Sequence, residues 1–107
     1  MELLAGAAEN KKAINVCSLD IKKASNVIDY LLVMSAGSNP QIEAIKNEIS
    51  DNLVAANIKG VRWEGPIASG WIVLDLGDIV VHVMNEEQRE FYKLEELWAK
   101  DAIIFHY

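Results

Sequence analysis

The sequence has few of the residues that disulfide bonds, zinc sites and membrane spans require. Its single cysteine, Cys17, cannot form a disulfide within the chain, which fits a reducing cytoplasm. Its two histidines, His82 and His106, show no H-x-x-x-H spacing and no cysteine pair, so the pattern does not indicate zinc. No run approaches the ~20 apolar residues needed to cross a bilayer. We therefore expect a cytoplasmic protein with no metal, no cofactor and no membrane contact.

Targeting signals and linkers are also missing. The first residues, MELLAGAAENKK, lack a basic region followed by a long apolar stretch, so we expect no secretory signal. There are no repeats, low-complexity segments or linkers rich in Pro, Gly or Ser. With 51% apolar residues, the chain can bury a modest core. A single domain over residues 1–107 is expected.

The balance of charge is acidic. The chain carries 16 acidic and 10 basic residues, for a formal net charge of −6. Binding to a nucleic-acid backbone depends on clusters of Lys and Arg, so direct nucleic-acid readout is not expected. An acidic domain is better suited to a basic protein partner, because complementary potential speeds encounter.

Apolar patterning predicts eight elements. In order they are a helix in 2–12, strands in 14–19 and 29–36, a helix from Ser38 or Asn39 to before Gly60, a strand in 61–64, strands in 71–76 and 79–84, and a short helix from Asn85 to Trp98. The last nine residues, 99–107, predict an extra strand or a packed extension. This order indicates a mixed β-sheet with helices packed on it, an α/β or α+β sandwich.

The segment from Trp71 to Trp98 is the predicted working half of the molecule. Two β-rich runs flank a link that contains Gly77, a pattern typical of a hairpin. Asn85 then stands where an N-cap would, with Gln88 at the capping-box position. The apolar residues that follow include Leu94, Leu97 and Trp98, and their spacing predicts that the helix packs on the sheet.

Two acidic residues at the hairpin raise the question of catalysis. Gly37-Ser38 at a helix entry, followed by Asp75 and Asp78, loosely fits nucleotide transfer with magnesium. However, the carboxylates are spaced D-x-x-D around a turn, and no third joins them on one strand face. The preferred reading is turn-forming aspartates and a helix cap, with no catalytic residue and no enzyme activity. A nucleotide-binding enzyme with a degenerate site stays as an alternative.

Trp71 and His82 are the side chains most suited to a binding surface. Trp71 shares a strand face with Val73 and Asp75, opposite the aliphatic residues Ile72, Leu74 and Leu76. A tryptophan beside an acid is a common composition for a protein-binding anchor. The alternative is a core tryptophan beneath the first helix. For His82 we expect a half-buried ring that pairs with a carboxylate, or a place on a partner surface.

The sequence resembles the ribosomal silencing factor family, also called RsfS or Iojap. The strings GWIVLDLGDIVVHVM and R-x-F-Y-x-L-E-x-L-W carry the resemblance, with Asp29-Tyr30, Gly37-Ser38-Asn39 and Glu64-Gly65 upstream. It implies a nucleotidyltransferase-like α/β fold and binding to ribosomal protein L-fourteen on the large subunit. The resemblance further implies that a protein bound there blocks subunit joining by steric exclusion and so represses translation. It also implies that Trp71 lies on the surface that binds the ribosomal protein.

The partner-binding surface predicted from residues and resemblance together comprises ten positions. They are Glu64, Trp71, Val73, Asp75, Leu76, Gly77, Asp78, His82, Met84 and Tyr92. Contacts made by a longer N-terminal helix are not expected, because the segment before the first strand is short. The remaining alternative is a homodimeric interaction module with another basic partner, in which the exposed apolar face is the dimer interface.

Overall fold

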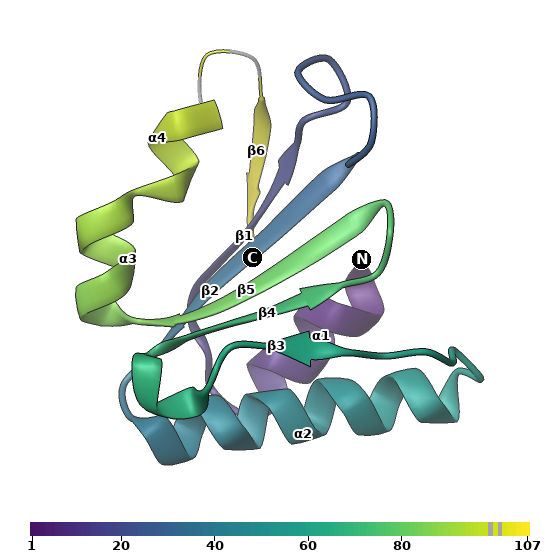
Figure 1. Cartoon of the computed structure of the whole chain (residues 1–107), viewed down its shortest axis with the longest axis vertical. Coiled ribbons are helices and arrows are strands. Elements are labelled where there is room, and N and C mark those ends of the chain that lie inside the picture. The colour runs from purple at the N-terminus through teal and green to yellow at the C-terminus, as the bar shows by residue number, and fades with distance from the viewer. Residues whose placement is uncertain (99, 101) are drawn as a thin grey trace.

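The computed structural model describes residues 1–98, 100 and 102–107 of the chain (Figure 1). Its elements are α1 (Glu2–Asn10), β1 (Ile14–Asp20), β2 (Tyr30–Ala36), α2 (Asn39–Ala55), β3 (Trp63–Glu64), the short 3-10 helix η1 (Ile67–Ser69), β4 (Trp71–Asp75), β5 (Ile79–Asn85), α3 (Glu86–Tyr92), α4 (Leu94–Trp98) and β6 (Ile103–His106). None of the helices in these ranges combines the length and the apolar character that a membrane span needs.

Six strands form one mixed sheet in the order β3-β4-β5-β2-β1-β6. The central pair, β2 and β5, is parallel, and every other neighbouring pair is antiparallel. A parallel pair needs a crossover connection, and here α2 lies within it. The predicted α/β fold, a mixed sheet with helices packed on it, is confirmed.

Each face of the sheet has its own apolar layer. On one face, Leu32, Met34 and the hairpin residues Ile72 and Leu74 pack with α1 and α2, which lie together in Figure 1. On the other face, residues such as Val33 pack with Leu94 and Trp98 of α4. Because β2 is buried on both faces, its sequence is a continuous apolar run rather than an alternating one.

The helix α2 follows from its sequence pattern. Ser38 caps it, since its hydroxyl accepts a hydrogen bond from the backbone N–H of Gln41 at 3.3 Å, and a proline stands in the first turn. Ile42, Ile45, Ile49 and Leu53 form one stripe, and all four are fully buried against the sheet. Burial of this stripe is the main apolar contribution of the longest helix to the fold.

The prediction for the last helix needs correction. Instead of one helix to Trp98, the chain forms two, because Lys93 adopts a left-handed conformation with φ of 47° and caps α3. Leu97, beyond the break, is 72% exposed. The prediction that Leu97 packs on the sheet is therefore wrong. Trp98 does pack there.

The C-terminal residues add the sixth strand. β6 pairs with β1, with Ile104 opposite Leu19, and β6 forms one edge of the sheet. The predicted extra strand is therefore confirmed for 103–106, while Ala99 and Asp101 of the same tail lie outside the described residues. At the other edge, β3 has two residues, so the strand predicted in 61–64 is shorter than expected.

Gly70 lies where η1 meets β4, and the structure requires glycine there. Its φ is 78°, and an added Cβ would lie 2.1 Å from the side-chain nitrogen of Asn85, the residue that caps α3. Gly60 also has a positive φ of 76°, but an added Cβ there would meet nothing within 4 Å.

We predict that Gly70→Ala lowers the free energy of unfolding by about 3 kcal/mol, since backbone strain and overpacking add. Gly60→Ala is the matched control and should cost about 1 kcal/mol, from backbone strain alone. Urea denaturation of both variants measures the difference. Equal losses would show that the Asn85 contact does not constrain this turn.

Candidate functional site

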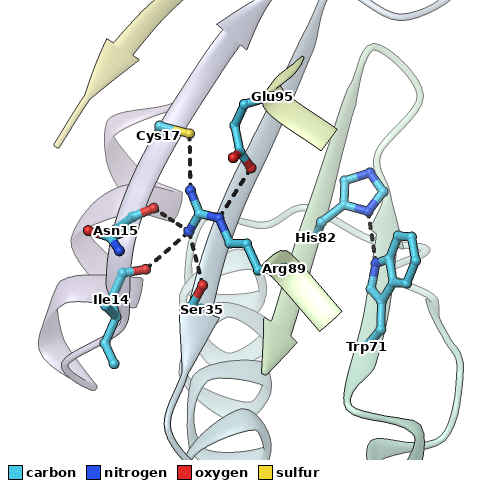
Figure 2. Close-up of polar contacts among 8 residues, drawn as sticks. All are labelled: Ile14, Asn15, Cys17, Ser35, Trp71, His82, Arg89 and Glu95. Carbon is cyan, nitrogen blue, oxygen red and sulfur yellow. Dashed lines mark hydrogen bonds and ion pairs between the residues drawn. The ribbon is translucent and has the colours of Figure 1, made fainter. Parts of the chain in front are cut away.

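A tryptophan held in a fixed orientation forms the centre of the candidate site. The indole Nε1–H of Trp71 on β4 donates a hydrogen bond to Nδ1 of His82 on β5, with 3.1 Å between the nitrogens (Figure 2). An accepting Nδ1 requires the neutral imidazole. Burial lowers the pKa of His82 from its usual 6.5 to about 4, so the ring is neutral near pH 7. The partner of His82 is thus an indole and not the carboxylate predicted from the sequence.

Two aromatic side chains of α3 extend this pair toward solvent. The ring centroid of Tyr92 lies 4.8 Å from that of Trp71, and Phe91 lies 5.0 Å from Tyr92. Tyr92 is 47% exposed and Phe91 is 76% exposed. His82, Trp71, Tyr92 and Phe91 therefore form a continuous row from the sheet to the surface, which we call the aromatic row.

A groove of about 320 Å³ runs beside the aromatic row. Trp71, Val73 and Tyr92 line it together with the polar residues Glu64, Ser69 and Gln88. The Nε2 of Gln88 donates to the carbonyl of Ser69 at 3.1 Å, which ties α3 to the turn before β4. The groove is thus built from β3, β4 and α3, which the fold brings to one edge of the sheet.

A largely buried arginine holds α3 against the sheet. The side chain of Arg89 is 13% exposed, and its guanidinium donates to five groups (Figure 2). They are the carbonyls of Ile14 and Asn15, the Ser35 hydroxyl at 3.1 Å, the Glu95 carboxylate at 3.2 Å and the Cys17 sulfur at 3.5 Å. We call this set the Arg89 clamp. It joins α3 to β1, β2 and α4.

The carbonyls of the Arg89 clamp are available because β1 is irregular at that point. Asn15 has a φ of 50°, and the pairing of β1 with β2 shifts register between Ile14 and Cys17. Such a bulge leaves backbone groups outside the ladder and changes their direction. Burial raises the pKa of the Cys17 thiol, against the opposing effect of Arg89, so the sulfur here is a neutral acceptor.

Comparison with known proteins assigns the chain to a family. Residues 1–105 match the family described as "Ribosomal silencing factor during starvation". The chain is 37% identical to ribosomal silencing factor RsfS of Bacillus subtilis over 99 residues, which is 92% of this chain and 84% of that protein. The chain belongs to the ribosomal silencing factor family.

Solved structures agree with this assignment to the ribosomal silencing factor family. A crystal structure of a protein from Chromobacterium violaceum superposes with a TM-score of 0.85 at 33% identity, covering 92% of this chain and 82% of that one. A crystal structure from Bacillus halodurans gives a TM-score of 0.80 at 34% identity, covering 95% and 93%. The resemblance stated from sequence motifs is confirmed.

The structure brings together half of the residues predicted for a partner surface in this family member. Glu64, Trp71, Val73, His82 and Tyr92 lie at or beside the groove. Trp71 shares a face with Val73, as predicted. The alternative of a core tryptophan beneath the first helix is wrong, because α1 packs on the opposite face.

The other predicted residues lie elsewhere. Asp75, Leu76, Gly77 and Asp78 form the β4–β5 turn, at the far end of β4 from Trp71 and roughly 13 Å along the strand. An Asp75 oxygen accepts the Gly77 N–H at 2.8 Å, which is the turn-forming role expected from the spacing. Among the described residues, no three His, Cys, Asp or Glu side chains gather as metal ligands.

Met84 requires a correction, since it was predicted on the partner surface. Its side chain is fully buried with Cys17 and Val33 in the second apolar layer, so a partner cannot reach it. Period-two alternation placed it correctly on the face of His82. Alternation alone could not show that the other residues of the second apolar layer cover this side chain.

The predicted partner surface did not include Arg89 or Phe91, although both belong to the motif R-x-F-Y that carries the family resemblance. Arg89 stands on a short helix among charged residues, and nothing in that pattern separates a buried arginine from a solvated one. Phe91 belongs to the apolar spacing of the helix, which suggested packing and not 76% exposure. The break at Lys93 is the feature that could have indicated this exposure, and Lys has no special preference for the left-handed conformation found there.

The Arg89 clamp generates a stability prediction. We expect Arg89→Lys to lower the free energy of unfolding by about 2 kcal/mol, because an ammonium cannot supply donors to carbonyls, hydroxyl and carboxylate at once. Arg62→Lys, at an exposed arginine before β3, is the control and should change stability by less than ~0.5 kcal/mol. Chemical denaturation measures both, and a harmless Arg89→Lys would contradict the clamp.

The pair of His82 and Trp71 generates a pH prediction. The unfolded chain protonates His82 below about pH 6.5, whereas the folded chain does so only near pH 4. Because the unfolded state then binds the extra proton, folding stability should fall as pH drops through this window. His82→Gln keeps an acceptor but does not titrate, so its stability should fall less steeply. The free energy of unfolding of both proteins is measured by chemical denaturation across this pH range. The same pH dependence in both would contradict the lowered pKa of His82.

Proposed function

We propose that this member of the ribosomal silencing factor family binds ribosomal protein L-fourteen on the large subunit through the aromatic row and its groove. The observation that carries the proposal is the fixed orientation and partial exposure of the Trp71 ring. Its ring is fixed by His82, flanked by the exposed Tyr92, and left partly open to solvent. Tryptophan and tyrosine in such settings dominate the binding energy of protein interfaces.

Rigidity supports a role in binding. The aromatic row spans two strands and a helix, and the Arg89 clamp fixes the helix to the sheet. A preorganised surface loses less side-chain freedom when a partner docks. Little of the binding energy is therefore spent on ordering Trp71 and Tyr92.

Charge also supports a basic partner. The described residues that line the groove include one carboxylate, that of Glu64, and neither a lysine nor an arginine. The chain as a whole carries a net charge of −6. Ribosomal proteins are basic in general, so the long-range field favours encounter with one of them.

The proposed action is obstruction. A domain bound to L-fourteen on the side that faces the small subunit occupies space that the small subunit needs. Subunit joining is then blocked and translation is repressed, in the cytoplasm, without any bond being made or broken. On this proposal the protein is a binding factor and not an enzyme.

We predict that Trp71→Ala weakens binding to purified large subunits by more than ~1 kcal/mol while the chain stays folded. Co-sedimentation with large subunits measures binding, and circular dichroism verifies the fold. Phe105→Ala is the matched control, since Phe105 is 59% exposed on β6, far along the sheet order from β4. Undiminished sedimentation of Trp71→Ala would overturn the proposal, and so would an equal loss in Phe105→Ala.

A further inference from the structure

We infer that the groove beside Trp71 and Tyr92 receives an arginine side chain from the protein partner. The identity of that partner rests on the proposed function, whereas the chemistry of the groove does not. Three properties of the groove support the inference: two aromatic walls, one carboxylate, and an indole whose N–H is already used.

The aromatic walls favour a cation. Trp71 and Tyr92 contact each other, with centroids 4.8 Å apart and ring planes tilted by 52°, and both residues line the groove. Cations are attracted to the faces of aromatic rings, most strongly to tryptophan. Because the indole N–H donates to His82, Trp71 offers the groove its ring and no competing donor.

The polar groups of the groove include a carboxylate and other acceptor oxygens. Glu64 supplies a carboxylate from the end of β3. Gln88 uses one of its two amide N–H groups on the carbonyl of Ser69, and its amide oxygen can accept a hydrogen bond from a ligand. A groove with a negative charge and acceptors, but no cationic side chain among its described lining residues, is complementary to a donor-rich cation.

Arginine matches this set better than other side chains. Its planar guanidinium stacks on aromatic rings and presents a fork of donors to a carboxylate, which the compact lysine ammonium does not. An aliphatic side chain would cover Glu64 without giving it a partner, which costs free energy. A nucleic-acid phosphate would be repelled by Glu64.

The first test uses small probes and the isolated chain. Acetyl-arginine amide, acetyl-citrulline amide and acetyl-leucine amide are titrated while the indole N–H signal of Trp71 is followed by NMR. The Trp71→Phe variant identifies that signal among the three tryptophans. We expect the arginine probe to shift the signal with at least about threefold higher affinity than the neutral citrulline or the leucine probe. Equal responses to all three would overturn the inference.

Variants then test the walls and the carboxylate separately. Tyr92→Phe should keep arginine affinity, while Tyr92→Leu and Glu64→Gln should each lower it at least about threefold. Glu43→Gln, at an exposed carboxylate on α2, is the charge-matched control and should have no effect. A loss in Glu43→Gln as large as in Glu64→Gln would show a general charge effect and overturn the site.

The two proposals fail differently. If the chain does not bind large subunits but the arginine probe binds the groove, the proposed function falls and the groove chemistry stands. If the chain binds large subunits while arginine, citrulline and leucine probes respond alike, the arginine site alone falls.

Discussion

The position of α3 depends on one buried guanidinium. Arg89 reaches from α3 to β1 and β2, and its hydrogen bonds join segments more than 50 residues apart in the chain. Withdrawing a charge from water is costly unless it is paired and hydrogen-bonded, and Glu95, the two carbonyls and Ser35 supply these partners. Without this contact, α3 would have few anchors, since none of its residues is fully buried.

The consequences extend from Arg89 to the surface. Because α3 is fixed, Tyr92 lies beside Trp71, and the groove has two walls instead of one. The sheet contributes the other constraint, as alternation along β4 sends Ile72 and Leu74 into the core and turns Trp71 to the opposite face. Hairpin and helix thus define the aromatic row together, and neither does so alone.

Much of the fold could be predicted from local pattern. The stripe on α2, the hairpin around Gly77 and the caps at Ser38 and Asn85 each follow from residues close in sequence. The capping box was only half right, since Gln88 reaches the carbonyl of Ser69 and not the backbone of Asn85. The partner of the Gln88 side chain depends on the position of the turn before β4, which is distant in sequence.

The site was harder to predict because it depends on contacts between distant segments. Trp71, His82 and Tyr92 were all predicted for the partner surface, and the structure brings them together. The hydrogen bond between Trp71 and His82 joins neighbouring strands, so the sequence of either strand alone could not predict it. The burial of Met84 follows from packing in the second apolar layer, and the exposed Leu97 lies beyond the break at Lys93, which leaves no clear mark in the sequence. The role of Arg89 needs a bulge 74 residues away.

The most direct measurement is a cryo-EM reconstruction of the chain bound to the large ribosomal subunit. Our account predicts that L-fourteen contacts the aromatic row, with Trp71 and Tyr92 at the interface and the α1–α2 face turned away. A reconstruction in which the chain contacts the ribosome through α1 and α2, or through β6, would contradict it.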